Sequence, residues 1–92
     1  METLTLNNGV VLENSTALEN EDSLYIYTNN NYSVKDLCDA LYLPASIARI
    51  VAVYPGGETT YTGFNKLIAV RDEGKGFTTA VLKRTVQDNG GS

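Results

Sequence analysis

The chain has 92 residues, of which 42% are hydrophobic and 20% are charged, and its formal net charge is −4. This length fits one small domain with a modest core, and we expect it to span residues 1–86. The mild negative charge argues against a protein that coats nucleic acid and is too small for a mimic of DNA, so we do not expect a nucleic-acid partner. The unpatterned segment 87–92, QDNGGS, predicts a flexible tail that is partly a cloning remnant.

Charge is unevenly distributed along the sequence. Residues 1–32 contain five acidic residues and no lysine or arginine, whereas all seven basic residues lie from position 35 onward. Ordinary solvated surface explains such a distribution. The alternative is a pair of complementary patches that meet in a homo-oligomer or hold an anionic partner.

The start of the chain, METLTLNNG, has no basic leader and no long apolar run, so we expect no signal peptide. No stretch approaches the length of a membrane span. The one cysteine, Cys38, excludes an intrachain disulfide and fits a reducing compartment. These features predict a cytoplasmic protein that does not engage a membrane.

The segment Leu4–Glu13, LTLNNGVVLE, predicts a β-hairpin. Its turn contains Asn8 and Gly9, the favoured pair where two residues need positive φ. The polar stretch Asn14–Asp22 that follows predicts a connecting loop.

The next segment, SLYIYT (Ser23–Thr28), predicts a strand by its alternation. Leu24 and Ile26 face one side and Tyr25 and Tyr27 the other. An asparagine triplet then predicts a turn.

A short helix is predicted over Ser33–Pro44. Ser33 and Asp36 form a pattern like a capping box at its start, and Pro44 ends it. The helix is too short to be stable alone, so its apolar stripe must lie against a sheet. That stripe comprises Val34, Leu37, Cys38, Leu41 and Tyr42.

The second half of the chain predicts strands over Arg49–Pro55, Phe64–Glu73 and Gly76–Val86, with Glu58–Tyr61 continuing the first of them after a turn. A glycine-rich loop over 72–76 links the last two strands as a hairpin. The whole pattern predicts an α+β fold of order β-β-β-α-β-β-β. It is a five- to six-stranded, mostly antiparallel sheet with one short helix packed on one face. The opposite face carries Tyr, Thr, Lys and Arg and meets either water or another copy, so we expect a homo-oligomer.

The glycine-rich stretch Tyr54–Gly63, YPGGETTYTG, could in principle cradle a phosphate. A phosphate loop needs Gly-Lys-Ser/Thr before a helix, and here a strand follows Gly63. The stretch therefore predicts a turn.

Catalytic and metal-binding patterns are missing from the sequence. There is no histidine, and Cys38 lies on the apolar stripe of the helix, which indicates core packing. The acidic groups of 19–22 and 72–73 lie in predicted loops without the spacing of a metal site. We expect a protein that is not an enzyme and uses no cofactor and no metal.

One set of residues suggests a binding site. Basic residues on the last two strands, with aromatic rings near them, could grip an anionic ligand, although ordinary strand-edge charge explains them too. The set comprises Arg71, Lys83, Arg84, Lys66, Tyr54, Tyr61 and Phe77.

Three segments carry a resemblance to a known group: LTLNNGVVLENSTALE near the start, ETTYTGFNKLIAV, and TTAVLKR. The layout over about residues 3–86 resembles small uncharacterised proteins of phages and prophages of Firmicutes. The resemblance implies a phage-encoded accessory protein without enzymatic activity, located in the host cytosol, and it carries no catalytic residues.

Two functions remain open from the sequence. In the first, the protein counters host antiviral defence by binding a host effector protein or an anionic signalling nucleotide. In the second, it is a structural part of the virion, such as a tail, baseplate or head-decoration protein. An unrecognised enzyme is the poorer third reading. The basic residues beside tyrosines favour the first.

Overall fold

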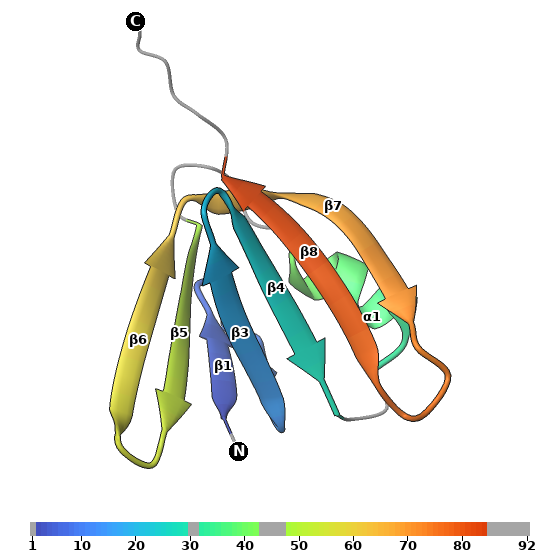
Figure 1. Cartoon of the computed structure of the whole chain (residues 1–92), viewed down its shortest axis with the longest axis horizontal. Helices are drawn as coiled ribbons and strands as arrows, with labels where there is room; N and C mark the ends of the chain where they lie inside the picture. The colour runs from blue at the N-terminus through green and yellow to red at the C-terminus, as the bar shows by residue number, and fades with distance from the viewer. Residues whose placement is uncertain (1, 30–31, 43–47, 85–92) are drawn as a thin grey trace, which may run out of the picture.

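The computed structural model describes residues 2–29, 32–42 and 48–84. These residues form eight strands and one short helix (Figure 1). The elements in chain order are β1 (Thr3–Leu6), β2 (Val11–Leu12), β3 (Ser15–Asn20), β4 (Ser23–Thr28), α1 (Val34–Ala40), β5 (Arg49–Tyr54), β6 (Gly57–Thr62), β7 (Phe64–Asp72) and β8 (Thr78–Arg84).

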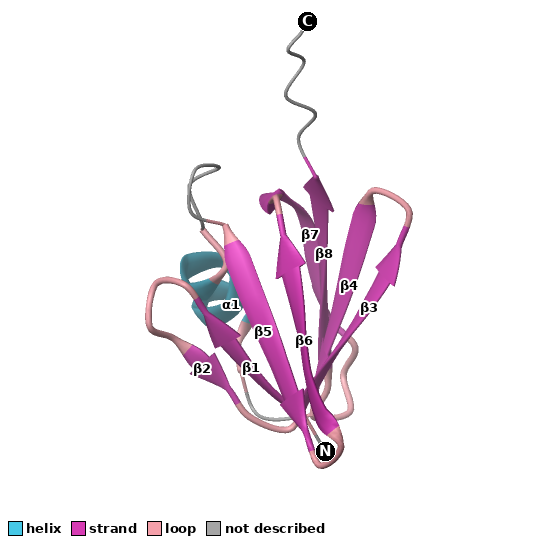
Figure 2. Cartoon of the chain, turned by 90° about the vertical axis from the view of Figure 1, so that its left-hand side faces the viewer, coloured by secondary structure: helices cyan, strands magenta, loops and turns pink. Residues whose placement is uncertain are grey.

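The strands form two antiparallel sheets of four. The first sheet has the order β2-β1-β5-β6 and the second sheet has the order β3-β4-β8-β7 (Figure 2). The expected α+β class, with mostly antiparallel strands and one short helix, is confirmed. The strands are eight rather than five or six, and they are divided between two sheets rather than placed in one.

At two of the crossings between the sheets, a residue has a left-handed backbone. Asn14, with φ of 52°, lies between β2 in the first sheet and β3 in the second. Gly63, with φ of 86°, lies between β6 and β7 in the same way. Glycine and asparagine adopt positive φ more readily than other residues, so these positions suit a sharp change of direction.

The core lies between the two sheets, where strands such as β4 turn their buried apolar side chains inward. In β4, Leu24 and Ile26 are fully buried while Tyr25 and Tyr27 are half-buried on the opposite side, as the alternation predicted. Leu4 and Ile50 face this core from the first sheet.

The helix α1 completes the core beside β7 and the β1–β2 hairpin. Ser33 Oγ accepts a bond from the Asp36 amide and the Asp36 carboxylate accepts one from the Ser33 amide, so the predicted capping box is present. Leu37 and Leu41 are buried. The other members of the predicted stripe differ: Cys38 is half-buried, while Val34 and Tyr42 are exposed. Pro44 lies outside the described residues.

The first hairpin is confirmed, but its turn differs from the expected one. Gly9 has φ of 91° whereas Asn8 does not have positive φ, and the Gly9 amide donates to the Leu6 carbonyl. Only one residue therefore needs the left-handed region. The Asn8 side chain instead bonds the Val10 amide and the Ala40 carbonyl, which ties the hairpin to α1.

Two further expectations need correction. The stretch Asn14–Asp22 was expected to be a loop, but most of it is β3, an edge strand paired with β4. Glu58–Tyr61 belongs to a separate strand, β6, that pairs with β5 across the turn at Pro55 and Gly56. The predicted loop over 72–76 is confirmed, with Gly74 and Gly76 at positive φ. The end of the strand predicted to reach Val86, and the tail 87–92, lie outside the described residues.

Candidate functional site

The outer surface of the second sheet gathers tyrosines and unpaired basic residues in ordered rows. Strand pairing places residues of β4, β8 and β7 beside one another on this surface. The rows, read from β4 through β8 to β7, are Tyr27 with Thr79 and Arg71, Tyr25 with Val81 and Ala69, and Ser23 with Lys83 and Lys66. We call this surface, from the Lys66–Lys83 pair to Phe77, the tyrosine face.

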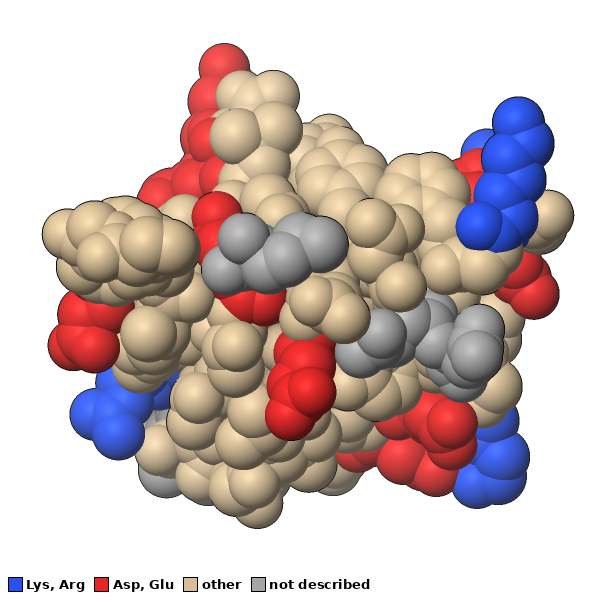
Figure 3. Space-filling view, turned by 90° about the horizontal axis from the view of Figure 1, so that it is seen from below, with Lys and Arg blue, Asp and Glu red and all other residues tan. Residues whose placement is uncertain are grey.

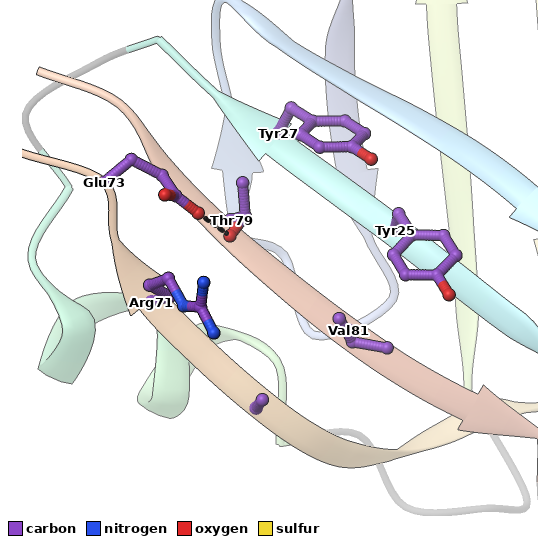
Figure 4. Close-up of a pocket in the computed structure, with 7 residues that line it drawn as sticks. Tyr25, Tyr27, Arg71, Glu73, Thr79 and Val81 are labelled. Carbon is purple, nitrogen blue, oxygen red and sulfur yellow. Dashed lines mark hydrogen bonds between the residues drawn. The ribbon is translucent and has the colours of Figure 1, made fainter. Parts of the chain in front are cut away.

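The middle of the tyrosine face is a shallow depression of about 300 Å³. Figure 4 shows Tyr25 and Tyr27 projecting from β4 on the same side, with Arg71 reaching over β7 toward the centre. Thr79 Oγ1 donates a hydrogen bond of 2.8 Å to the Glu73 carboxylate, which closes one end. The lining residues are Tyr25, Tyr27, Ala69, Arg71, Glu73, Thr79 and Val81.

Aromatic rings continue beyond the depression. The rings of Tyr27 and Phe77 stack with centroids 6.4 Å apart and planes 11° from parallel. Because Phe77 immediately precedes β8, its ring extends the row begun by Tyr25 and Tyr27. The tyrosine face therefore offers flat apolar surface for another ring to stack on.

The basic residues of the tyrosine face have no acidic partner among the described residues. Ion pairs in that part of the chain involve Lys35 and Arg84, whereas Arg71, Lys66 and Lys83 are exposed and make none. Lys66 and Lys83 are directly opposite each other on neighbouring strands, an arrangement that repels. Three cations without an ion pair thus share this surface with one carboxylate, that of Glu73, in a protein whose net charge is −4.

Arg84, also predicted for the site, is placed elsewhere. Because Lys83 points outward, Arg84 turns inward, and its guanidinium lies 4.1 Å from the centre of the Phe64 ring. It donates to the Thr62 carbonyl of the first sheet at 3.2 Å and pairs with Glu19 of the second at 3.5 Å. Arg84 therefore joins the two sheets.

Tyr54 and Tyr61 lie on the first sheet, away from the tyrosine face. The Tyr54 hydroxyl shares a hydrogen bond of 2.7 Å with Thr59. Tyr61 packs against the core, and burial raises its pKa, with a further contribution from the negative charge of Glu2 and Glu19. Of the seven predicted residues, the structure brings four to the tyrosine face: Arg71, Lys83, Lys66 and Phe77.

Tyr25 and Tyr27 were missing from the predicted site. The signal was present, since the alternation of SLYIYT already placed both rings opposite Leu24 and Ile26. The sequence does not reveal that β4 pairs with β8. This pairing brings the two rings beside the basic residues of the last hairpin.

A second depression, of about 320 Å³, lies between the first hairpin and α1 and is mostly apolar. Its two carboxylates already have structural partners, because Asp36 caps the helix and Asp39 pairs with Lys35 at 2.8 Å.

Seen from the lower end of Figure 1, acidic side chains are scattered over the surface and basic ones lie at its margins (Figure 3). The tyrosine face is the stronger candidate.

The predicted turn in the glycine-rich stretch is confirmed. Tyr54 pairs with Gly57 across the two-residue turn, and strand β7 follows Gly63 directly.

Among the described residues, no group of three or more Cys, Asp or Glu side chains could hold a metal ion, and no helix is long and apolar enough to cross a membrane. Comparisons with family models, curated proteins and solved structures gave no match.

Proposed function

We propose that this chain is a non-enzymatic binding protein that holds an anionic partner on the tyrosine face. The observation that carries the proposal is the placement of three unpaired cations, Arg71, Lys66 and Lys83, on the same surface as half-buried tyrosines. Unpaired exposed cations attract an anion, and flat rings beside them give it a stacking surface.

The absence of catalysis belongs to the same proposal. The sequence has no histidine, which is the commonest general base, and its one cysteine lies on α1 rather than on the tyrosine face. On that face, the Glu73 carboxylate is engaged with Thr79. The groups that remain are cations and aromatic rings, which suit the binding of an anion.

The resemblance to phage and prophage proteins suggests the cell in which the protein would act, a bacterium infected by a phage. In the cytosol of an infected cell, the partner would be a host antiviral effector with an acidic surface or an anionic signalling nucleotide. Binding would withhold that partner from host defence.

Native mass spectrometry on protein purified gently from a Firmicutes lysate tests the proposal. The face variant, Lys66→Gln/Arg71→Gln/Lys83→Gln, is compared with the charge-matched control Lys35→Gln/Arg49→Gln/Lys75→Gln. The proposal predicts a retained anionic protein or small molecule on the wild type and the control, and its loss from the face variant. Equal retention by both variants would remove the tyrosine face as the binding surface.

A second candidate, a structural part of the virion, rests on a different feature. Strand β6 is an edge of the first sheet and pairs regularly with β5, with Glu58 as its one charged residue and no proline or bulge. Edge strands without such features tend to pair with other chains. If β6 drives self-assembly, Thr60→Lys should dissociate the oligomer in analytical ultracentrifugation, whereas Lys66→Gln/Lys83→Gln should leave it intact.

A further inference from the structure

We infer that the anionic partner of the tyrosine face is single-stranded nucleic acid, with bases stacked on the tyrosines and phosphates held by the basic residues. This inference rests on the proposed binding of an anion at the tyrosine face, and it puts a nucleic-acid strand in place of the effector protein or signalling nucleotide named above. It reverses the expectation drawn from net charge, since the local charge of this surface differs from that of the whole chain. The face carries three positive side chains and one carboxylate, that of Glu73, so its local charge stays positive.

The spacing of the rings suits consecutive bases. Tyr25 and Tyr27 are two positions apart on β4, so their Cα atoms are roughly 6.6 Å apart along the strand and their rings project to the same side. Phe77 continues the row by stacking on Tyr27. Rings repeated along a sheet surface are how proteins hold unpaired bases, because every base has a flat face.

The cations flank this row of rings. Arg71 lies in the row of Tyr27, two strands away, and Lys83 and Lys66 lie in the row next to Tyr25. A strand with its bases on β4 would therefore run its phosphates along β8 and β7. The repulsion between Lys66 and Lys83 is relieved when a phosphate lies between them.

The shape of the surface favours a single strand over a duplex. Base-specific reading of duplex DNA usually requires a helix or ribbon that enters a groove. Here the described helix, α1, packs on the inner side of the second sheet, beside β7 (Figure 1). The tyrosine face itself is a shallow sheet surface on which unpaired bases can lie flat.

Fluorescence anisotropy with a labelled oligothymidylate of about ten nucleotides tests the inference. We expect binding at low salt that weakens as salt is added. Each phosphate neutralised on a single strand contributes about 0.7 to the slope of log K against log salt, so three cations predict a slope of about −2. A duplex of the same length should bind at least tenfold more weakly. An unlabelled dinucleotide that competes as well as the longer strand would overturn the assignment to a strand.

Matched variants connect binding to the tyrosine face. Tyr25→Val and Tyr27→Val keep β-propensity and remove one ring each, and each should weaken binding by roughly 5- to 150-fold. Lys66→Gln/Lys83→Gln should lower affinity and flatten the salt slope, whereas Lys35→Gln/Arg49→Gln, with the same net charge, should do neither. Circular dichroism and thermal unfolding establish that each variant is folded.

The outcomes separate this inference from the proposed function. Absence of oligonucleotide binding at low salt, or equal binding by the ring and control variants, overturns the inference. If the face variant still loses a retained anionic protein in native mass spectrometry, the proposed function stands without it. If neither the oligonucleotide nor the retained partner depends on the tyrosine face, the inference and the proposed function are both wrong.

Discussion

Two neighbouring basic residues on β8, Lys83 and Arg84, lie on opposite sides of the second sheet and differ in role. Arg84 bonds the Thr62 carbonyl and lies over the Phe64 ring, whereas Lys83 is exposed without an ion pair among the described residues. A tight group of contacts indicates a structural residue. An exposed, unpaired charge is free to meet a partner.

Replacing these two residues separates stability from binding. Arg84→Met keeps an unbranched apolar stem but loses its hydrogen bonds, partly exposed ion pairs and ring contact, so the free energy of unfolding should fall by about 1–2 kcal/mol. Lys83→Met should change it by less than about 0.5 kcal/mol. Urea denaturation measures both. Equal losses would contradict the structural role of Arg84.

Gly63 is confined both by its backbone and by Arg84. Its φ is 86°, and a Cβ built there would lie 3.3 Å from the Arg84 side chain. Gly63→Ala should therefore lower the free energy of unfolding by about 1–2 kcal/mol. Gly56→Ala is the control, since a Cβ there meets nothing within 4 Å, and its effect should stay within about 0.5 kcal/mol. Chemical denaturation of the two variants gives the comparison.

Tyr61 links stability to alkaline pH. Burial, with Glu2, Glu19 and Tyr54, raises its pKa above the ordinary value of 10.0, so the unfolded chain loses this proton first. Between these two pKa values the folded protein holds more protons than the unfolded chain. The free energy of unfolding therefore falls as the pH rises from 10.0 to the pKa of Tyr61 in the folded state.

The variant Tyr61→Phe should remove part of that fall. Urea denaturation between pH 8 and 11 would show a shallower decline for Tyr61→Phe than for the control Tyr42→Phe, because Tyr42 is 81% exposed in the wild type. Identical pH profiles would show that Tyr61 does not contribute.

At the scale of elements, α1 depends on its N-terminal cap because it has only seven residues. Ser33→Ala removes the oxygen that accepts the Asp36 amide and should lower the free energy of unfolding by about 1 kcal/mol. Ser33→Asp supplies another acceptor and should stay close to the wild type. Thermal unfolding compares the two, and an equal loss in both would contradict a capping role.

Elements with clear alternation or turn chemistry could be predicted from the sequence. Leu24 and Ile26 alternate with tyrosines, so β4 was predicted with its faces assigned correctly. Strand β3 was missed because its inward residues, Ser15 and Ala17, are small, while its large apolar residue, Leu18, is 55% exposed. Burial alternates at the start of β3, but the hydrophobicity of its residues does not follow that alternation.

The candidate site could be predicted only in part for a related reason. Residues close in sequence on the last hairpin, such as Arg71 and Lys83, were grouped correctly. Tyr54 and Tyr61 are near the last hairpin in sequence, but Gly63 carries the chain from the first sheet to the second, so the two tyrosines lie on the other sheet. Tyr25 is far in sequence from Val81, its neighbour on β8, so the sequence does not reveal that it lies beside the basic residues.

At the scale of the whole molecule, net charge and local charge point to different partners. The chain carries −4 overall, yet its second sheet presents three unpaired cations on one surface. Attraction at contact distance depends on the local groups, whereas the net charge acts over longer distances and is screened within about 10 Å at 0.1 M salt. An anionic partner therefore fits this acidic protein at the tyrosine face.

The most direct test of the account is a nuclear magnetic resonance titration of ¹⁵N-labelled protein with inorganic tripolyphosphate at low salt. The probe carries several charges and requires no knowledge of the natural partner. Anion binding at the tyrosine face predicts amide shifts concentrated around Lys66, Arg71 and Lys83, with little change around Lys35 and Arg49. It also predicts loss of the response in Lys66→Gln/Arg71→Gln/Lys83→Gln. Shifts centred on Lys35 or Arg49, or an unchanged response in that variant, would contradict the tyrosine face as the anion-binding surface.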